Sequence, residues 1–334
     1  TNTPTAVPTQ QHIIKKSNFM QTITVIGLGT MGHGIAQTFA VAGYGVRMFD
    51  ENETVRDSVI ARIQQNLEVM LQNGLLESIN LDEVISRMIV CQGEQEACEQ
   101  SEFVFEAIAE DLDIKREFFK RCEKVVSQSS ILASNTSSFP NSMIAAGLTH
   151  PARCINTHWF NPAHVIPVVE IIPGEHTSED VVGAVMELLQ SIGKQPIRLH
   201  KEVPGFALNR IQIAMFREMV DLVEQGVISA SDLDRAVRGS LAIRWAAAGP
   251  MRVGDFGGWD VLGKVYEILV PSLRSDTQVH DVLAGMISRG EYGIKSGQGF
   301  YEYPQQELPD IIASKDKRFM TWAKLLSDSI TNGE

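Results

Sequence analysis

The 334-residue sequence lacks the features that mark several large classes of protein. It has no long run of lysine and arginine, and its formal net charge is −12. A nucleic-acid partner is therefore not expected, because binding to phosphates needs a basic face. No apolar stretch approaches the ~20 residues that cross a bilayer, so we expect no membrane span. No His-x-x-x-His pattern or Cys/His spacing typical of zinc occurs, and we predict no bound metal.

Cysteine is scarce and shows no pairing pattern. The four cysteines are Cys91, Cys98, Cys122 and Cys154, without a Cys-x-x-Cys pair or a dense framework. We expect reduced thiols in a cytoplasmic protein. The first 19 residues are rich in Thr, Pro and Gln and lack the apolar segment of a signal peptide. We expect residues 1–19 to be a flexible N-terminal extension or a cloning remnant, with Met20 as the natural start.

The remaining chain has the composition of a globular protein, with 44% hydrophobic and 21% charged residues. Short apolar runs alternate with helical segments, which predicts a mainly parallel sheet joined by crossover helices. Beyond Pro204 the pattern turns helical, with a helix over 205–226 and a next helix capped by Ser231. We predict an α/β, Rossmann-type doubly wound domain over residues 20–203 and an all-helical C-terminal domain over 204–334. The predicted strands cover residues 22–29, 44–50, 87–91, 103–108, 131–134, 153–160, 168–172 and 196–200, and the first predicted helices cover 32–42 and 52–78.

A glycine-rich segment directly follows the first predicted strand and opens the first helix. It consists of Gly27, Leu28, Gly29, Thr30, Met31 and Gly32. In a dinucleotide site, such glycines allow a tight turn, close approach of the pyrophosphate and close packing of helix on strand. A plain glycine turn is the alternative interpretation. The strand before the segment and the helix after it favour a dinucleotide site.

An acidic residue completes this pattern. Asp50 ends the second predicted strand, about 20 residues after the glycines, where a carboxylate binds the ribose hydroxyls. The same carboxylate repels the extra phosphate of NADP. We interpret Arg47 and Arg56, the nearest arginines, as solvated charges. The sequence therefore predicts NAD as the cofactor.

Polar residues near the ends of later elements are candidates for the chemistry. Ser137 follows an apolar strand, and the carboxyl ends of strands are where open α/β sheets bind ligands; a helix cap or turn is the alternative. His158 follows another strand, and Glu170 interrupts an apolar run, where a carboxylate is costly unless it is paired. A histidine oriented by a buried carboxylate suits a general base for an alcohol proton. Asn209 falls near the start of the helix after Pro204. It either faces a ligand or is a polar residue of the first helical turn that binds none.

From about residue 20 to residue 303, the sequence resembles the L-3-hydroxyacyl-CoA dehydrogenase family. The motifs that carry the resemblance are GLGTMGHGIAQ (27–37), FEAIAEDLDIK (105–115), SNTSS (134–138), HWFNP (158–162), VVEII (168–172), PGFALNR (204–210) and GIKSGQGFYEY (293–303). The resemblance implies that His158 removes the hydroxyl proton while C3 gives its hydride to NAD. It implies that Glu170 orients His158, and that Ser137 and Asn209 position the substrate oxygens.

The resemblance carries further expectations about ligands and assembly. It implies that NAD is also touched by Glu110, Lys115, Asn161 and Lys295. It implies a small acyl substrate, such as a CoA thioester, and a homodimer formed by the helical domain. The pattern of apolar and polar residues over 311–326 predicts one more amphipathic helix after the region of resemblance.

The sequence departs from the family where better-known members carry a lysine that meets the CoA nucleotide. Residues 61–78 contain no lysine, and Asn66 and Asn73 stand roughly where CoA contacts fall. Loss of a cation opposite a phosphate removes a contact of about 1.5–3 kcal/mol. The leading hypothesis is a short-chain 3-hydroxyacyl-CoA substrate; the alternative is the same chemistry on a free acid, a carnitine-like molecule or a carrier-bound acyl group. A non-catalytic NAD-binding protein, like the related lens crystallins, is a third interpretation, disfavoured by the candidate catalytic residues.

Overall fold

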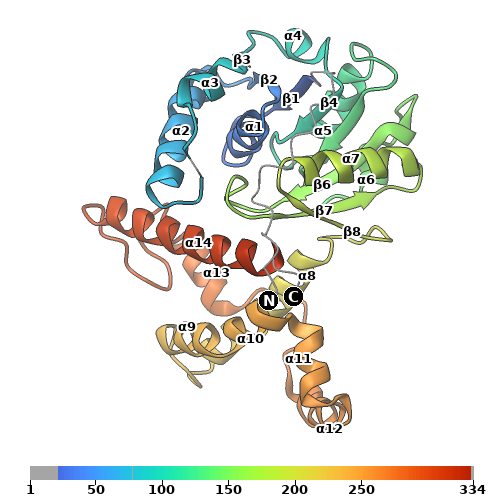
Figure 1. Ribbon diagram of the computed structural model, residues 1–334. Helices are drawn as coiled ribbons and strands as arrows, with labels where there is room; N and C mark the ends of the chain where they lie inside the picture. Colours follow the sequence, from blue (N-terminus) through green and yellow to red (C-terminus); the bar gives the residue numbers. More distant parts are fainter. Residues whose placement is uncertain (1–21, 77, 332–334) are drawn as a thin grey trace, which may run out of the picture. The chain divides into compact units, whose positions relative to one another are not determined.

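A computed structural model describes residues 22–76 and 78–331 of the chain (Figure 1). These residues form two compact units, of which the first ends at Ala207 and the second begins at Leu208. The predicted N-terminal extension over residues 1–19 lies outside the described residues.

The first unit is built on one sheet of eight strands in the order β3-β2-β1-β4-β5-β6-β7-β8. All neighbouring strands are parallel except β6 and β7, which are antiparallel. The predicted doubly wound α/β fold is confirmed, and the carboxyl ends of β1, β4, β5 and β6 share one edge of the sheet. The strands are β1 (Thr22–Ile26), β2 (Gly45–Phe49), β3 (Met88–Val90), β4 (Phe103–Glu106), β5 (Ile131–Ser134), β6 (Cys154–Trp159), β7 (Val168–Pro173) and β8 (Gln195–Arg198).

Helices cover both faces of this sheet, so the central strands β1, β4 and β5 are mostly apolar and almost wholly buried. Side chains alternate between the two cores: in β4, Phe105 joins the core that contains Phe39 of α1, whereas Val104 joins the core that contains Phe118 of α5. This double burial explains why apolar residues in these central strands are not confined to alternate positions. The helices of the first unit are α1 (Gly32–Val41), α2 (Glu53–Gln72), α3 (Leu81–Ser86), α4 (Glu94–Cys98), α5 (Leu112–Cys122), α6 (Asn141–Ile144), the 3-10 turn η1 (Pro151–Arg153) and α7 (Glu179–Ser191).

Helix α2 is shorter than the predicted segment 52–78. It begins after Asn52, whose side chain accepts a hydrogen bond from the Val55 amide, and it ends at Gln72, with Asn73 as its C-cap. Gly74 then adopts a φ of 66°, and Leu75 donates to the Met70 carbonyl, which closes the helix end. A glycine in the left-handed region is the physical reason for the early stop.

The second unit is helical, as predicted. Its first helix starts only at Leu208, because Gly205 and Phe206 before it both have positive φ, 72° and 53°. The prediction that Ser231 caps the next helix is wrong: Ser229 is the cap, its hydroxyl accepts from the Asp232 amide, and Ser231 lies inside α9. The predicted C-terminal helix is confirmed. The elements are α8 (Leu208–Glu224), α9 (Ala230–Gly239), α10 (Leu241–Ala248), α11 (Pro250–Gly257), α12 (Trp259–Leu269), the 3-10 turn η2 (Val270–Ser272), α13 (Asp281–Ser288) and α14 (Leu308–Thr331).

Candidate functional site

The glycine-rich segment turns from β1 into α1, and two of its glycines leave no room for a side chain. Gly27 has a φ of 87°, and a Cβ there would lie 2.5 Å from the Ala107 carbonyl oxygen. A Cβ on Gly32 would lie 1.7 Å from the Gly27 oxygen. At Gly29, by contrast, a Cβ would meet no atom of the described residues within 4 Å. The segment therefore offers open space at Gly29 beside the first turn of a helix, which suits an approaching pyrophosphate.

The other members of this segment contribute mainly backbone. The side chain of Leu28 is fully buried in the core, so only its main chain faces the turn. Thr30 and Met31 form the turn itself, with Met31 as the residue before α1. Backbone amides near a helix start suit an anion because the helix dipole is positive there.

Asp50 lies immediately after β2 and braces this turn. Its Oδ2 accepts a hydrogen bond from the Leu28 amide at 2.6 Å, and its Oδ1 accepts from the Asn52 amide at 2.8 Å. Each carboxylate oxygen has a second lone pair, with which a ribose hydroxyl could bond. The geometry thus fits the ribose-binding role that the spacing predicts.

The interpretation of Arg47 and Arg56 as solvated charges is wrong. Arg56 is half-buried, and its Nη1 donates to the Asp50 carbonyl at 2.8 Å. Arg47 donates to the Glu96 carbonyl at 2.7 Å, on the side of α4. Neither contact could be found from spacing alone, because the partners are brought close by the packing of the sheet and its helices.

His158 and Glu170 face each other across the antiparallel pair β6 and β7. They are direct cross-strand partners, and His158 Nδ1 lies 2.7 Å from Glu170 Oε2. Glu170 is 1% exposed and His158 5%. The other carboxylate oxygen of Glu170 accepts from the Ala207 amide at 3.0 Å. A carboxylate acceptor favours a proton on Nδ1, which leaves the lone pair of the imidazole on Nε2.

Two aromatic rings flank this imidazole. The ring centroid of His158 lies 4.4 Å from that of Phe160 and 5.4 Å from that of Phe206. Phe206 is completely buried despite its positive φ. Packing on both rings and the bond to Glu170 together fix the orientation of the imidazole.

Glu110 and Ser137 meet at the carboxyl ends of β4 and β5. Glu110 Oε1 accepts from the Thr136 hydroxyl at 2.7 Å, from the Ser137 amide at 2.9 Å and from the Ser137 hydroxyl at 3.3 Å. Burial by itself raises the pKa of Glu110. The hydrogen bond from Thr136, the charge of Lys115 and the bond from Ser137 outweigh burial and hold this pKa below its usual value. Glu110 is thus held as a carboxylate beside Ser137.

Lys115 lies inside the unit rather than on its surface. Its ammonium is 2.6 Å from Glu106 Oε1 and 3.3 Å from Glu110 Oε2, and its side chain is 1% exposed. Glu106 also accepts from the Ser134 hydroxyl at 2.6 Å. A buried charge needs such pairing, since an isolated one would be strongly destabilising. The ion pair links β4, α5 and the residues that precede Ser137.

Glu106, Ser134 and Thr136 were not among the predicted site residues. Glu106 could have been found by the reasoning used for Glu170, because it ends the apolar run Phe103–Glu106 and also needs a partner. Ser134 and Thr136 flank Asn135, whose side-chain oxygen accepts from the Trp159 amide at 3.0 Å. No sequence signal distinguishes Ser134, Asn135 and Thr136 from ordinary turn residues.

The loop between His158 and Glu170 is anchored by a lysine. Asn161 is exposed in this loop and precedes Pro162 through a cis peptide bond. Lys194 donates to the carbonyls of Ala163 at 2.7 Å and Ile166 at 2.8 Å. Burial lowers the pKa of Lys194 to about 7. The anchoring holds the segment that carries Asn161 next to β6.

The remaining predicted residues belong to the second unit. Asn209 lies in the first turn of α8, and Lys295 is exposed in a turn closed by the bridge between Gly293 and Gln298. The structure therefore brings His158 together with Glu170, and Ser137 together with Glu110 and Lys115.

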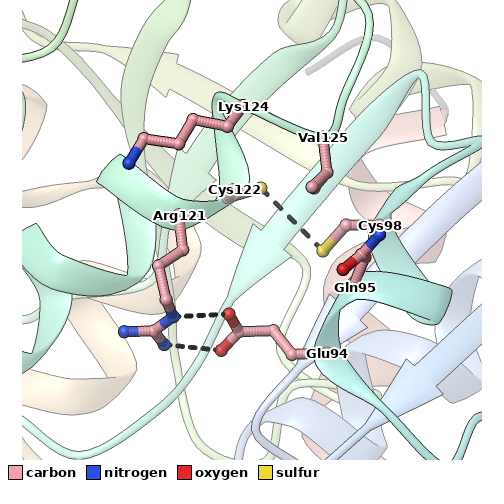
Figure 2. A pocket seen from close by; sticks show the side chains of 7 residues that line it. All are labelled: Glu94, Gln95, Cys98, Arg121, Cys122, Lys124 and Val125. Carbon is pink, nitrogen blue, oxygen red and sulfur yellow. Dashed lines mark hydrogen bonds and ion pairs between the residues drawn. The ribbon is translucent and has the colours of Figure 1, made fainter.

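A pocket between α4 and α5 contains none of these residues (Figure 2). Arg121 makes two hydrogen bonds to the Glu94 carboxylate there, at 2.8 and 2.7 Å, so the two charges neutralise each other. The Cys98 and Cys122 sulfurs lie 3.9 Å apart as free, buried thiols. The hydrogen bond to Cys98 and burial raise the pKa of Cys122, so the thiol stays protonated.

Two further observations concern metals and membranes. Within residues 22–76 and 78–331, no group of three or more His, Cys, Asp or Glu side chains is arranged to hold a metal ion. Among the helices of that part of the chain, none combines the length and the hydrophobicity of a membrane span.

Both parts of the chain match models of one protein family. Residues 22–203 match the family model described as 3-hydroxyacyl-CoA dehydrogenase, NAD binding domain, and residues 205–303 match the C-terminal domain of the same family. A probable 3-hydroxybutyryl-CoA dehydrogenase of Bacillus subtilis is 35% identical over 285 residues, which are 85% of this chain and 98% of that protein.

A second relative acts, by its name, on a different compound. The 5-formyl-3-hydroxy-2-methylpyridine 4-carboxylate 5-dehydrogenase of Mesorhizobium japonicum is 31% identical over 313 residues, covering 92% of this chain and 98% of that protein. A solved structure of a dehydrogenase of this name, described as an NAD+ dependent dismutase, has a TM-score of 0.86 and 31% identity. That similarity covers 92% of this chain and 99% of the other.

Proposed function

This chain belongs to the 3-hydroxyacyl-CoA dehydrogenase family and is an NAD-dependent oxidoreductase, and from that premise we propose that it interconverts a short-chain 3-hydroxyacyl thioester and its 3-keto form. The observation that carries the proposal is the buried pair His158 Nδ1 and Glu170 Oε2, 2.7 Å apart. In the alcohol-oxidising direction, His158 takes the hydroxyl proton on Nε2. Glu170 holds the Nδ1 proton and stabilises the imidazolium that results.

Bound NAD would accept the hydride. The residues of the chain bind NAD, position the substrate and take the hydroxyl proton. We propose that residues 20–203 bind NAD through the segment Gly27–Gly32, Asp50, Glu110, Lys115 and Asn161, and that Lys295, in the helical domain over 204–334, is a further NAD contact. Ser137 and Asn209 hydrogen-bond the substrate oxygens. Glu110, kept ionised by its neighbours, accepts from the Ser137 hydroxyl at 3.3 Å; because a hydroxyl has one proton, Ser137 exchanges this bond for the bond to the substrate oxygen.

The same chemistry on a non-CoA 3-hydroxy substrate, such as a free acid, is the second candidate. Helix α2 contains no lysine, and the two asparagines expected at CoA contacts bond internally: Asn66 to Gln37, and Asn73 to the Val69 carbonyl. The Mesorhizobium relative, which is named for a pyridine carboxylate, covers more of this chain than the Bacillus relative does. Both observations favour a substrate without the CoA nucleotide.

One comparison of substrates separates the two candidates. NADH formation is measured with 3-hydroxybutyryl-CoA, its pantetheine thioester and free 3-hydroxybutyrate at equal concentrations. A kcat/KM for the CoA ester at least ~10-fold above that of the pantetheine ester supports CoA, since one charge-assisted phosphate contact has about that effect. Equal values for the two esters, or turnover of the free acid alone, support the second candidate. No turnover of any of the three contradicts the first candidate and the free-acid form of the second.

We also propose that the chain is a cytoplasmic homodimer joined through its second unit. None of the residues of α9, α10, α11 and α12 is buried, and large apolar side chains there are open to solvent, including Phe256 at 77% and Ile268 at 73%. Apolar surface on this scale marks an interface. Sedimentation should show a dimer that Phe256→Glu dissociates, whereas Lys120→Glu on α5 should leave it intact. A wild-type monomer contradicts this proposal.

A further inference from the structure

Two arginines of α2 lie near Asp50, the residue at which the connection from β2 to α2 begins. Arg56 donates to the Asp50 carbonyl, and its guanidinium stands 5.7 Å from the centre of the Phe49 ring. It is therefore held on the residue that we place at the ribose. The Phe49 ring packs on one face of the guanidinium, and the Asp50 carbonyl bonds to one edge of it. An arginine held in this way loses little conformational freedom when it binds an anion.

Arg62 approaches the same place from about 1.7 turns further along the helix. Its Nη2 donates to the Leu28 carbonyl at 2.8 Å and to the Val55 carbonyl at 3.0 Å, and its Nε donates to the Ser58 hydroxyl at 3.3 Å. A guanidinium has five N–H donors, and these bonds use three of them, so the two on Nη1 are not used in them. Burial lowers the pKa of Arg62, and the charge of nearby Asp50 opposes that shift.

Both cations lie near the residue that distinguishes the cofactors: Arg56 bonds to the Asp50 carbonyl, and Arg62 is close enough to the Asp50 carboxylate to interact with its charge. NADP differs from NAD by a phosphate on the ribose 2′-oxygen, the hydroxyl that a carboxylate at this position binds. A carboxylate repels that phosphate, whereas a nearby arginine binds it, because guanidinium and phosphate match in charge and in geometry. Asp50 holds its carboxylate in place with two backbone amides. The arrangement therefore contains both the group that rejects the phosphate and the groups that bind it.

We propose that Arg56 and Arg62 form a phosphate-binding pair that accepts the 2′-phosphate of NADP once the Asp50 charge, which repels that phosphate, is removed. The proposal rests on the ribose-binding role proposed for Asp50. In the wild-type chain the Asp50 charge prevents the two arginines from binding a ribose 2′-phosphate.

The test is direct binding of NADH and NADPH, followed by cofactor fluorescence, to the full chain. In Asp50→Ser the Kd for NADPH should fall by roughly 10- to 150-fold, the effect of one charge-assisted contact, while NADH binding weakens. Adding Arg62→Gln or Arg56→Gln to Asp50→Ser should reverse the gain by at least ~10-fold. Asp50→Asn, which keeps one hydrogen-bond acceptor, repeats the test if the serine variant does not fold.

Two matched controls separate a local site from a general change of charge. Asp57→Ser removes the same charge from an exposed position next to Arg56, and it should leave NADPH binding unchanged. Arg47→Gln, added to Asp50→Ser, removes an arginine that is bonded toward Glu96 and should keep the gain. If Asp50→Ser and Asp50→Asn bind NADH but gain no affinity for NADPH, or if Asp57→Ser gains as much, the proposal is overturned. Failure of wild-type protein to bind NADH would instead contradict the proposed function.

Discussion

The substitution Glu170→Gln tests how the buried carboxylate controls the histidine. The hydrogen bonds of Glu170 include one from His158 Nδ1 at 2.7 Å and one from the Ala207 amide at 3.0 Å. A glutamine has only one oxygen and also carries an NH2 group, so it can accept on only one of these two sides. If its oxygen faces Ala207, its NH2 faces the imidazole and draws the ring proton to Nε2. If the oxygen faces His158, two N–H donors oppose each other at Ala207.

The cost follows from this conflict. A buried donor without an acceptor costs about 1–3 kcal/mol, which lowers the midpoint of thermal unfolding by roughly 2–12 °C for a unit of this size. The effect on catalysis is larger, because a proton on Nε2 removes the lone pair that takes the hydroxyl proton. Amide replacement of an orienting carboxylate in a serine protease lowers kcat by about 10⁴ through the same change of tautomer. We expect kcat to fall by about 10²–10⁴ in Glu170→Gln.

The assay is NADH formation with saturating NAD, on whichever substrate the comparison of thioesters and free acid identifies. Thermal unfolding and NADH binding are measured on the same samples, so that loss of fold is distinguished from loss of the base. Glu175→Gln, an exposed glutamate just beyond β7, is the control and should match the wild type. A folded Glu170→Gln protein with kcat within about 3-fold of the wild type would refute the reasoning, since the tautomer would then be irrelevant to the rate.

Three further predictions concern the framework of the site. Gly32→Ala places a Cβ 1.7 Å from the Gly27 oxygen and should weaken NADH binding at least ~10-fold by direct titration, whereas Gly45→Ala, which meets no described atom within 4 Å, should not. Glu106→Gln removes the nearer carboxylate of Lys115 and should lower the free energy of unfolding in urea by about 3–5 kcal/mol, with part of the loss recovered in the double variant with Lys115→Met. Burial, aided by the charges of His33 and Lys194, lowers the pKa of His164 from 6.5 to about 4, so between these values the unfolded chain binds more protons than the folded one. Stability should therefore fall by up to about 3 kcal/mol as the pH drops through that window, and His164→Gln should flatten this part of the profile.

Local rules were sufficient for the elements that position the site. The apolar run over β1, the glycines after it and Asp50 after β2 follow from the needs of a strand, a turn and a helix start, which involve neighbours in sequence. Glu170 is predictable for a different reason, because a carboxylate in an apolar strand needs a partner, and the connection back to His158 is short.

The rest depends on contacts between distant segments. Ser229 and Ser231 are equally good caps by type, and only the path of the chain after Gly226 decides between them. The burial of Lys115 requires Glu106 on a neighbouring strand, and the contact of Arg62 with the Leu28 carbonyl requires α2 to pack beside the glycine turn. Such pairings come from tertiary packing, which periodicity and spacing do not report.

Replacing His158 with Gln, and measuring NAD binding and turnover on the same preparation, tests the central claim most directly. We predict a Kd for NAD within about 3-fold of the wild type and a kcat lower by about 10²–10⁴, because the base is lost while the cofactor contacts of the glycine turn and Asp50 remain. A variant that binds NAD normally and turns over substrate at the wild-type rate would contradict the assignment of His158 as the base.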